Sequence, residues 1–309
     1  MLFFNRGVSF NPKTDIPSLE GKVILVTGGN SGLGKQSVLE FARHEPAQIW
    51  LAARDSDKAK TAIDDVRKEV PNANIKHIEL DLTSLDSVRN AAKTLLEQSD
   101  RLDLLLLNAG IMASPPGLTQ DGLELQFGVN HVAHALLTKL LMPLLLKTAE
   151  APNADVRVIV LSSVGHNMSP KEGIQFENVH TKCDNVQTWT RYGQSKLANA
   201  LFARELAKRY PQLKTAAVHP GAVNTNLGRY LKESYPFLSF LQPLADLLLT
   251  SIESGTKNQL WASVSKDVVS GEYYTPVGVH GNASPQARDD ALARKLWEWT
   301  EEELKAYEV

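Results

Sequence analysis

The stretch KVILVTGGNSGLGK, residues 22–35, decides the fold class. Its first half is a short apolar run that is typical of a buried strand, and its second half is a glycine-rich turn that leads into a helical pattern. Glycines in such a turn let the backbone amides at a helix amino terminus approach a phosphate closely. We therefore predict a diphosphate-binding loop. It comprises Gly28, Asn30, Ser31, Gly32, Leu33 and Gly34.

Apolar runs and amphipathic helical patterns alternate along the rest of the chain. The further runs are 48–53, 75–80, 103–108, 156–163 and 214–220, and the helical patterns are 34–44, 56–70, 85–98, 123–148 and 192–210. This alternation implies right-handed crossovers and helices on both faces of a parallel sheet. We predict an α/β fold of the Rossmann type, a doubly wound parallel sheet, in one domain over residues 21–309.

Two segments lie outside this alternation. Residues 1–20 are predicted to be an extension on the surface, and residues 224–254 a substrate lid, because ligands of open α/β sheets bind beyond the carboxyl ends of the strands. The apolar stretch 237–252 is 16 residues long, and a membrane-spanning helix needs about 20. We expect a helix packed over a core or pocket, with peripheral membrane attachment as the alternative.

Composition excludes several classes of protein. A net charge of -2 over 309 residues gives no basic surface for nucleic acid. Cys183 is the only cysteine, so a disulfide scaffold is excluded and a cytoplasmic location is expected. His134, His219 and Cys183 lack the spacing of a metal site, and no metal is predicted.

The segments after the second, third and fourth runs indicate which nucleotide the loop binds. The second run ends in Arg54, where an NAD-selective site usually has an acidic residue. Arg54 and Lys58 can instead pair with the 2′-phosphate of NADP. Further along the chain, Asp81 and Leu82 are predicted to flank the adenine. Asn108, Ala109 and Gly110 are predicted to let the backbone lie close to the cofactor.

Tyr192 and Lys196 stand four residues apart in a helical pattern, so both side chains lie on one helix face. A nearby ammonium favours the phenolate, and we therefore predict a lowered pKa for Tyr192. Ser163, at the end of the fifth run, can hydrogen-bond an oxygen where negative charge develops. Asn130 can hold a water molecule through which Lys196 relays protons.

Six motifs occur in an order that resembles one family. TGGNSGLG, LNAG, FGVNH, LSS, YGQSK and HPGAVNT are arranged as in the short-chain dehydrogenase/reductase family, and the resemblance covers about residues 20–290. GNSGLG, FGVNHVAH, SSVGH and YGQSKLAN are more narrowly similar to the retinol dehydrogenase and WW-domain oxidoreductase-like branch, including fungal members. The resemblance implies about seven strands in the order 3-2-1-4-5-6-7.

The resemblance also implies roles for individual residues. Asn130, Ser163, Tyr192 and Lys196 would form a catalytic tetrad, with Ser162 as the alternative serine. Tyr192 and Lys196 would also contact the cofactor, as would Pro220, Gly221, Val223 and Thr225, the last at the nicotinamide carboxamide. The expected substrate-pocket residues are Met112, His166, Met168, Phe176, Trp189, Leu227, Tyr230 and Leu231.

These observations predict an NADP(H)-dependent oxidoreductase that interconverts a carbonyl and an alcohol on a hydrophobic small molecule. Two alternatives keep the fold: a non-redox transformation such as dehydration, cyclisation or epimerisation, and a non-catalytic NADP-binding regulatory module. Helices 123–148 and 192–210 have broad apolar faces, which in the family often build a homodimer. In a monomer, a carboxyl-terminal helix at about 286–304 would cover them.

Overall fold

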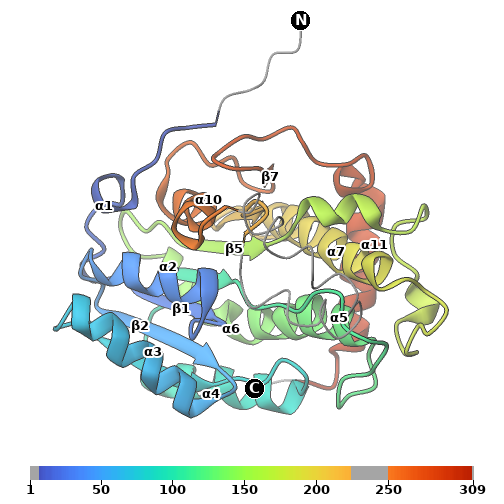
Figure 1. Ribbon diagram of the computed structural model, residues 1–309, viewed down its shortest axis with the longest axis horizontal. Coiled ribbons are helices and arrows are strands. Elements are labelled where there is room, and N and C mark those ends of the chain that lie inside the picture. Colours follow the sequence, from blue (N-terminus) through green and yellow to red (C-terminus); the bar gives the residue numbers. More distant parts are fainter. Residues whose placement is uncertain (1–6, 224–249, 308–309) are drawn as a thin grey trace, which may run out of the picture.

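The computed structural model describes residues 7–223 and 250–307, and its centre is one parallel sheet (Figure 1). The seven strands lie in the order β3-β2-β1-β4-β5-β6-β7. Their bounds are β1 Val23–Thr27, β2 Gln48–Ala53, β3 Ile75–Glu79, β4 Leu104–Leu107, β5 Arg157–Leu161, β6 Lys214–Val218 and β7 Tyr273–Tyr274. The predicted fold class, strand number and strand order are confirmed.

Helices cover both faces of the sheet because side chains alternate along each strand. Val23 and Leu25 of β1 join one buried apolar cluster, with α4, α6 and α7, whereas Ile24 and Val26 join the other, with α2, α3 and α10. The main helices are α2 Gly32–Ala42, α3 Ser56–Glu69, α4 Leu85–Gln98, α6 Ala133–Ala149, α7 Thr188–Arg209, α10 Ile252–Val264 and α11 Asp290–Glu303.

The apolar pattern 123–148 is not one regular α-helix. It begins with the short α5, Leu125–Phe127, continues through a π-helical turn at Gly128–Val132, and only then becomes α6. Among the described residues, Leu125–Ala149 is the one helix with the length and hydropathy of a membrane span. However, 83% of its most apolar window is buried inside the fold, as expected for the central helix of a core.

The amino-terminal extension is docked on the domain. Phe10, Ile16 and Leu19 are buried in the same apolar cluster as α2 and α10. The short helix α1, Pro12–Asp15, is held by the ring of His44, whose Nε2 lies 2.9 Å from the carbonyl oxygen of Pro12. Residues 10–19 therefore contribute to the core, which the prediction of a surface extension did not anticipate.

The carboxyl-terminal helix α11 runs alongside α7 (Figure 1). Trp297 stacks on Phe202 of α7 with ring centroids 5.6 Å apart, and Trp299 meets the edge of Phe127 at 5.9 Å. Helix α11 thus covers apolar surface of α7 and α5. It begins at Asp290 rather than near Gln286, because Asp289 caps it by accepting from two backbone amides.

Candidate active site

The glycine loop connects β1 to α2 in a shape that requires glycine. Gly28 and Gly32 have φ values of +67° and +52°, in the left-handed region. A Cβ at Gly34 would collide with the carbonyl oxygen of Gly28, and one at Gly28 would lie 3.1 Å from Ala109. Ser31, the N-cap of α2, makes no capping hydrogen bond with its side chain. The helix amino terminus therefore keeps backbone amides for a phosphate.

Basic side chains lie beyond the end of β2. Arg54 is exposed, and its Nη1 lies 3.9 Å from Oδ2 of Asp81, while Nζ of Lys58 lies 2.9 Å from Oδ2 of Asp55. The Asp81 side chain is 23% exposed and that of Asp55 is 41% exposed, so solvent reaches both carboxylates, and such pairs are weak. The side chain of Leu82 is 8% exposed and packs in the core, so only the backbone of this residue is available to flank an adenine.

The segment after β4 is tied to the end of β1. The side-chain amide of Asn108 donates to the carbonyl oxygen of Thr27 at 2.9 Å, and the backbone amide of Ala109 donates to Oγ1 of Thr27 at 3.0 Å. A Cβ on Gly110 would lie 3.0 Å from Oδ1 of Asn130 and 3.4 Å from Nζ of Lys196. This segment thus lies between the glycine loop and the predicted catalytic residues.

Three of the four predicted tetrad residues form one cluster above the end of β5. Tyr192 and Lys196 project from α7, with Lys196 Nζ 5.7 Å from the centre of the Tyr192 ring. Lys196 Nζ also donates to the carbonyl oxygen of Leu161 at 3.1 Å. The hydroxyl of Ser163, one residue beyond Ser162 at the end of β5, hydrogen-bonds that of Tyr192.

The two serines point in different directions. Ser162 is buried, and its hydroxyl donates to the backbone carbonyl of Lys196 at 2.7 Å, which anchors α7 to β5. Ser163 accepts from the amide of Gly165 at 3.0 Å and faces Tyr192. The geometry therefore favours Ser163 over Ser162 as the residue that can reach an oxygen beside Tyr192.

Asn130 lies in the π-helical turn, and its side-chain amide is fully occupied. Its Oδ1 accepts from the amide of Ile111 at 2.8 Å, and its Nδ2 donates to the carbonyl oxygen of Ile111 and to Oγ of Ser195, each at 2.9 Å. Ser195 in turn donates to the carbonyl oxygen of Tyr192 at 2.8 Å. The Asn130 side chain thus links the segment after β4 to α7.

Burial dominates the pKa values of the cluster. Tyr192 is 4% exposed, and burial raises its pKa to about 12, although the hydrogen bond from Ser163 lowers it. Burial likewise lowers the pKa of Lys196 to about 8. The predicted lowering of the Tyr192 pKa by Lys196 is therefore wrong for this structure. The loss of solvation outweighs an ammonium that lies over the ring.

The residues between Ser163 and Tyr192 divide into two groups. Trp189 meets the Tyr192 ring edge-on at 6.3 Å, and Met168 is 42% exposed near Gly165. Phe176 instead packs against Trp299, away from Tyr192. Trp189 and Met168 therefore lie near the cluster. Phe176 packs on α11 instead, which differs from the expectation that it lines the substrate pocket.

His166 also differs from its expected place in a substrate pocket. It is completely buried, with Nδ1 2.6 Å from the carbonyl oxygen of Ser163 and Nε2 3.0 Å from the amide of Ser284. Both ring nitrogens therefore have backbone partners, and burial lowers the pKa of the imidazole. His166 fixes the chain on both sides of the ring and has no free atom for a substrate.

The segment after β6 is described only at its beginning. Gly221 has a φ of +93°, and Val223 forms a β-bridge with Thr250. Met112, in the segment after β4, is half-buried. The other predicted residues here, Thr225, Leu227, Tyr230 and Leu231, lie outside the described residues, as does most of the predicted lid.

Three interactions around the site escape sequence reasoning. Arg191 and Glu124 form an ion pair at 2.9 Å, with side chains 3% and 1% exposed. Arg191 also donates to the carbonyl oxygen of Ser114 at 3.0 Å. Gln259 of α10 donates to Ser37 at 2.7 Å beneath the glycine loop. Charged residues in these positions look like ordinary surface residues in a sequence, and no spacing rule distinguishes them.

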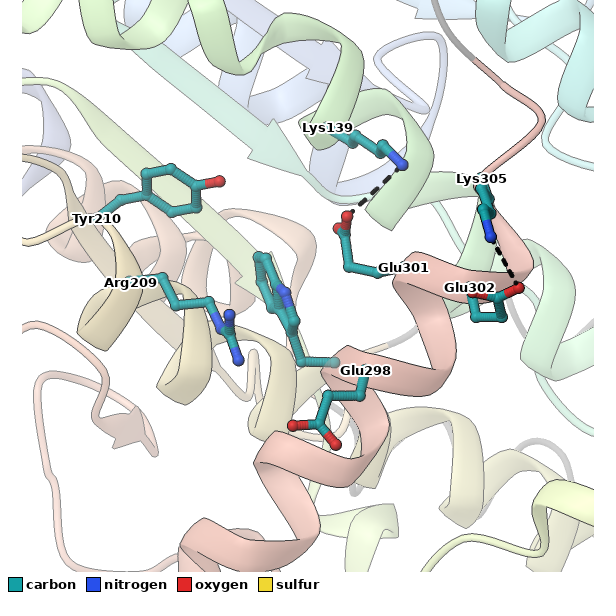
Figure 2. A pocket seen from close by; sticks show the side chains of 8 residues that line it. Lys139, Arg209, Tyr210, Glu298, Glu301, Glu302 and Lys305 are labelled. Carbon is teal, nitrogen blue, oxygen red and sulfur yellow. Dashed lines mark hydrogen bonds and ion pairs between the residues drawn. The ribbon is translucent and has the colours of Figure 1, made fainter.

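A surface hollow of about 720 Å³ lies elsewhere, where α11 meets the middle of α6 and the carboxyl end of α7 (Figure 2). Its lining is mostly charged, with Nζ of Lys139 3.6 Å from a Glu301 carboxylate oxygen and Arg209 4.9 Å from the Trp297 ring. None of its lining residues belongs to the cluster around Tyr192. The hollow is therefore separate from the candidate active site around Tyr192.

Comparison with known proteins places this architecture in a family. A family model described as short chain dehydrogenase matches residues 22–175. Short-chain dehydrogenase/reductase drtF of Aspergillus calidoustus is 40% identical over 311 residues, which cover 95% of this chain and 97% of that protein. The chain belongs to the short-chain dehydrogenase family. It is therefore an oxidoreductase of the type that acts on CH–OH groups.

The narrower resemblance is also confirmed. Retinol dehydrogenase 13 of Homo sapiens is 38% identical over 286 residues, covering 91% of this short-chain dehydrogenase and 83% of the human protein. Among solved structures, an uncharacterized protein from Mycobacterium Paratuberculosis is 30% identical with a TM-score of 0.75, covering 97% of this chain and 98% of that one.

Proposed function

We propose that this short-chain dehydrogenase uses NADP(H) to interconvert a carbonyl and an alcohol on an apolar small molecule, with Tyr192 as the acid/base. The observation that carries the proposal is the cluster of half-buried Ser163 with buried Tyr192 and Lys196 at the carboxyl end of β5. It lies next to the segment that ties β4 to the glycine loop. A phenol, a hydroxyl and an ammonium together can protonate a substrate oxygen and stabilise its developing charge.

The glycine loop supports a dinucleotide because its glycines let the start of α2 pack directly on Gly28, where a Cβ on Gly34 would collide. The amides at the start of α2 would hold the diphosphate, and Arg54 with Lys58 would hold a 2′-phosphate, since no acidic residue stands at the end of β2. When bound, the nicotinamide supplies or accepts the hydride. Asp81, Asn108 and the other residues that the sequence predicts as cofactor contacts would line the same nucleotide site.

Tyr192 is well suited to donate a proton. With a pKa near 12, it stays protonated at neutral pH. Lys196, with a pKa near 8, is mostly charged there and favours the phenolate that remains after the transfer. Ser163 would donate to the same substrate oxygen. Asn130 would act by holding Ile111 and α7 in place, because its side-chain amide is fully engaged.

The substrate class follows from the side chains around Tyr192. Trp189 meets the Tyr192 ring, and Met112 and Met168 are predicted to line the same pocket. Pockets lined by aromatic and thioether side chains with few polar anchors bind apolar ligands. One relative at 38% identity is named for retinol, an apolar alcohol. A hydrophobic aldehyde or ketone, or the matching alcohol, is therefore the substrate that we propose.

The test is a titration of the purified protein with NADPH and NADH by nucleotide fluorescence. Turnover of hydrophobic aldehydes and ketones is then measured from the absorbance of the reduced nicotinamide. Tyr192→Phe should abolish turnover and leave nucleotide binding nearly intact, whereas Tyr210→Phe, at the C-cap of the same helix, serves as the matched control. Binding without turnover of any compound would favour a non-redox or regulatory function, and absence of binding would refute the proposed nucleotide site.

A further inference from the structure

A buried path of hydrogen bonds connects the glycine loop to α7, and its central residue is His134. The Thr27 hydroxyl, one residue before Gly28, accepts from the amide of Ala109 at 3.0 Å and lies 3.0 Å from Nε2 of His134. Nδ1 of His134 lies 3.1 Å from the carbonyl oxygen of Asn130. Thr27, His134 and Asn130 are at most 2% exposed.

The partners determine where the imidazole holds its proton. The carbonyl oxygen of Asn130 can only accept a hydrogen bond, so Nδ1 of His134 carries the proton and donates. Nε2 is then an acceptor for the hydroxyl proton of Thr27, whose oxygen accepts from Ala109. Burial lowers the pKa of His134 to about 4, which keeps the ring neutral at physiological pH. Each ring nitrogen thus makes a different, specific bond.

The bond to Asn130 lies in the π-helical turn between α5 and α6. In this turn the amide of Ala133 donates to Gly128, five residues earlier, so the helix is wider than an α-helix. His134 supplies a side-chain donor to the Asn130 carbonyl within the widened turn. π-helical turns are frequent at functional sites. Here the turn presents the Asn130 side chain to Ile111 and Ser195.

We propose that His134 is a positioning residue that fixes the π-helical turn, and with it the Asn130 side chain, relative to the glycine loop. His134 thereby fixes the position of Ile111 through the Asn130 side chain. Through Asn130 and Ser195 it also fixes the first turns of α7, which carry Tyr192. The structural part of the inference stands on these contacts alone. Its kinetic consequence rests on the proposed function.

Two substitutions remove one bond each. In His134→Gln the side chain reaches Thr27 and lacks the donor at the Nδ1 position, so the contact with the Asn130 carbonyl is lost. In His134→Asn the amide nitrogen replaces Nδ1, so the contact with Thr27 is lost. Thr27→Val removes that second contact from the other side, and Thr27→Ser restores the hydroxyl.

The first readout is amide hydrogen exchange in the full chain without nucleotide or substrate, which does not depend on activity. We expect the Ile111 amide, which donates to Asn130, to exchange at least about tenfold faster in His134→Gln than in wild type or His134→Asn. The Ala109 amide, which donates to the Thr27 hydroxyl, should likewise exchange faster in Thr27→Val than in wild type. Its exchange rate should return to the wild-type value in Thr27→Ser. Unchanged protection of Ile111 in His134→Gln would overturn the proposal.

The second readout is turnover with NADPH and a carbonyl that the wild type reduces. His134→Gln should lower kcat about tenfold or more, because small displacements of reacting groups are costly, and leave KM within about threefold. His131→Asn is the matched control, since His131 is 1% exposed in the same turn and contacts Thr300 of α11 at 3.3 Å. It should lower the melting temperature and leave kcat within about twofold.

The outcomes separate the two proposals. If the wild type reduces no carbonyl, the proposed function fails, and the exchange experiment still decides the role of His134. If the wild type is active and His134→Gln loses only thermal stability, as His131→Asn does, His134 is a structural residue and the inference fails.

Discussion

Lys196→Met should make the protein more stable while it abolishes turnover. Lys196 is 4% exposed and has no carboxylate among its described hydrogen-bond partners. Burial moves its pKa from 10.5 to about 8, and each pKa unit corresponds to about 1.4 kcal/mol. The buried ammonium therefore costs about 3 kcal/mol at pH 7, and methionine removes this cost with a side chain of similar length.

The change of the unfolding free energy with pH follows from the lowered pKa of Lys196. Between pH 8 and 10.5 the unfolded chain keeps the Lys196 proton and the folded chain has lost it, so unfolding free energy rises with pH in that window. The penalty is complete below pH 8 and disappears above 10.5. The stability advantage of Lys196→Met should consequently be largest at neutral pH and shrink as the pH rises through this window.

Urea denaturation of wild type and variant at several pH values between 7 and 10.5 measures both quantities. Lys305→Met is the control, because its ammonium is 74% exposed and pairs only with an exposed glutamate, so we expect a change within about 0.5 kcal/mol. A Lys196→Met protein that is less stable than wild type at pH 7 would refute the reasoning. So would a stability difference that stays constant up to pH 10.5.

Four further predictions concern other parts of the site. Arg54→Ala should narrow the preference for NADPH over NADH by about tenfold, or about 1.4 kcal/mol, in the nucleotide titration, and an unchanged ratio would exclude Arg54 from the cofactor site. Glu124→Gln leaves the buried guanidinium of Arg191 without its counter-ion and should lower the unfolding free energy by about 3 kcal/mol in urea, whereas equal stability would contradict the ion pair. Tyr273→Phe removes a buried hydroxyl that has no hydrogen-bond partner among residues 7–223 and 250–307, so the unfolding free energy should stay equal or rise by about 1 kcal/mol, and a loss of that size would mean that the hydroxyl is bonded. Carbonyl reduction should slow as the pH rises through about 8, where Lys196 loses its proton, and a rate that stays flat to pH 10 would contradict this dependence.

The sequence predicts the sheet well because each buried parallel strand leaves a continuous apolar run. The run DLLLLN and the strand Leu104–Leu107 coincide to within one residue at each end. The two-residue strand Tyr273–Tyr274 is too short to leave such a run, and it forms because it can add to the edge of β6. The strand order came from the family resemblance, since apolar periodicity does not say which strands are neighbours.

The π-helical turn at Gly128–Val132 could not be predicted from hydrophobic periodicity. One wider turn shifts the following helix by a single residue, and nearly every position from Phe127 to Leu137 is buried. A helix that is apolar on all sides shows no change of face when its register changes. The position of Asn130 relative to His134 and Thr27 therefore depends on tertiary packing.

The site residues illustrate the same limit. A spacing of four residues places Tyr192 and Lys196 on one face, but it carries no information on how much water surrounds them, and the predicted direction of the Tyr192 pKa was wrong for that reason. His166 was assigned to the substrate pocket because it lies in the right loop. Its second ring nitrogen binds the amide of Ser284, a residue far along the chain that no local pattern connects to it.

The burial of Tyr192, which raises its pKa, also affects the direction of the proposed reaction. A phenol with a pKa near 12 is an available proton donor over the whole physiological range, so reduction of a carbonyl requires no prior ionisation of Tyr192. Oxidation of an alcohol requires the phenolate, and the charge on Lys196 that would stabilise it is lost above about pH 8. In the proposed reaction, these protonation states at neutral pH therefore favour donation of a proton by Tyr192.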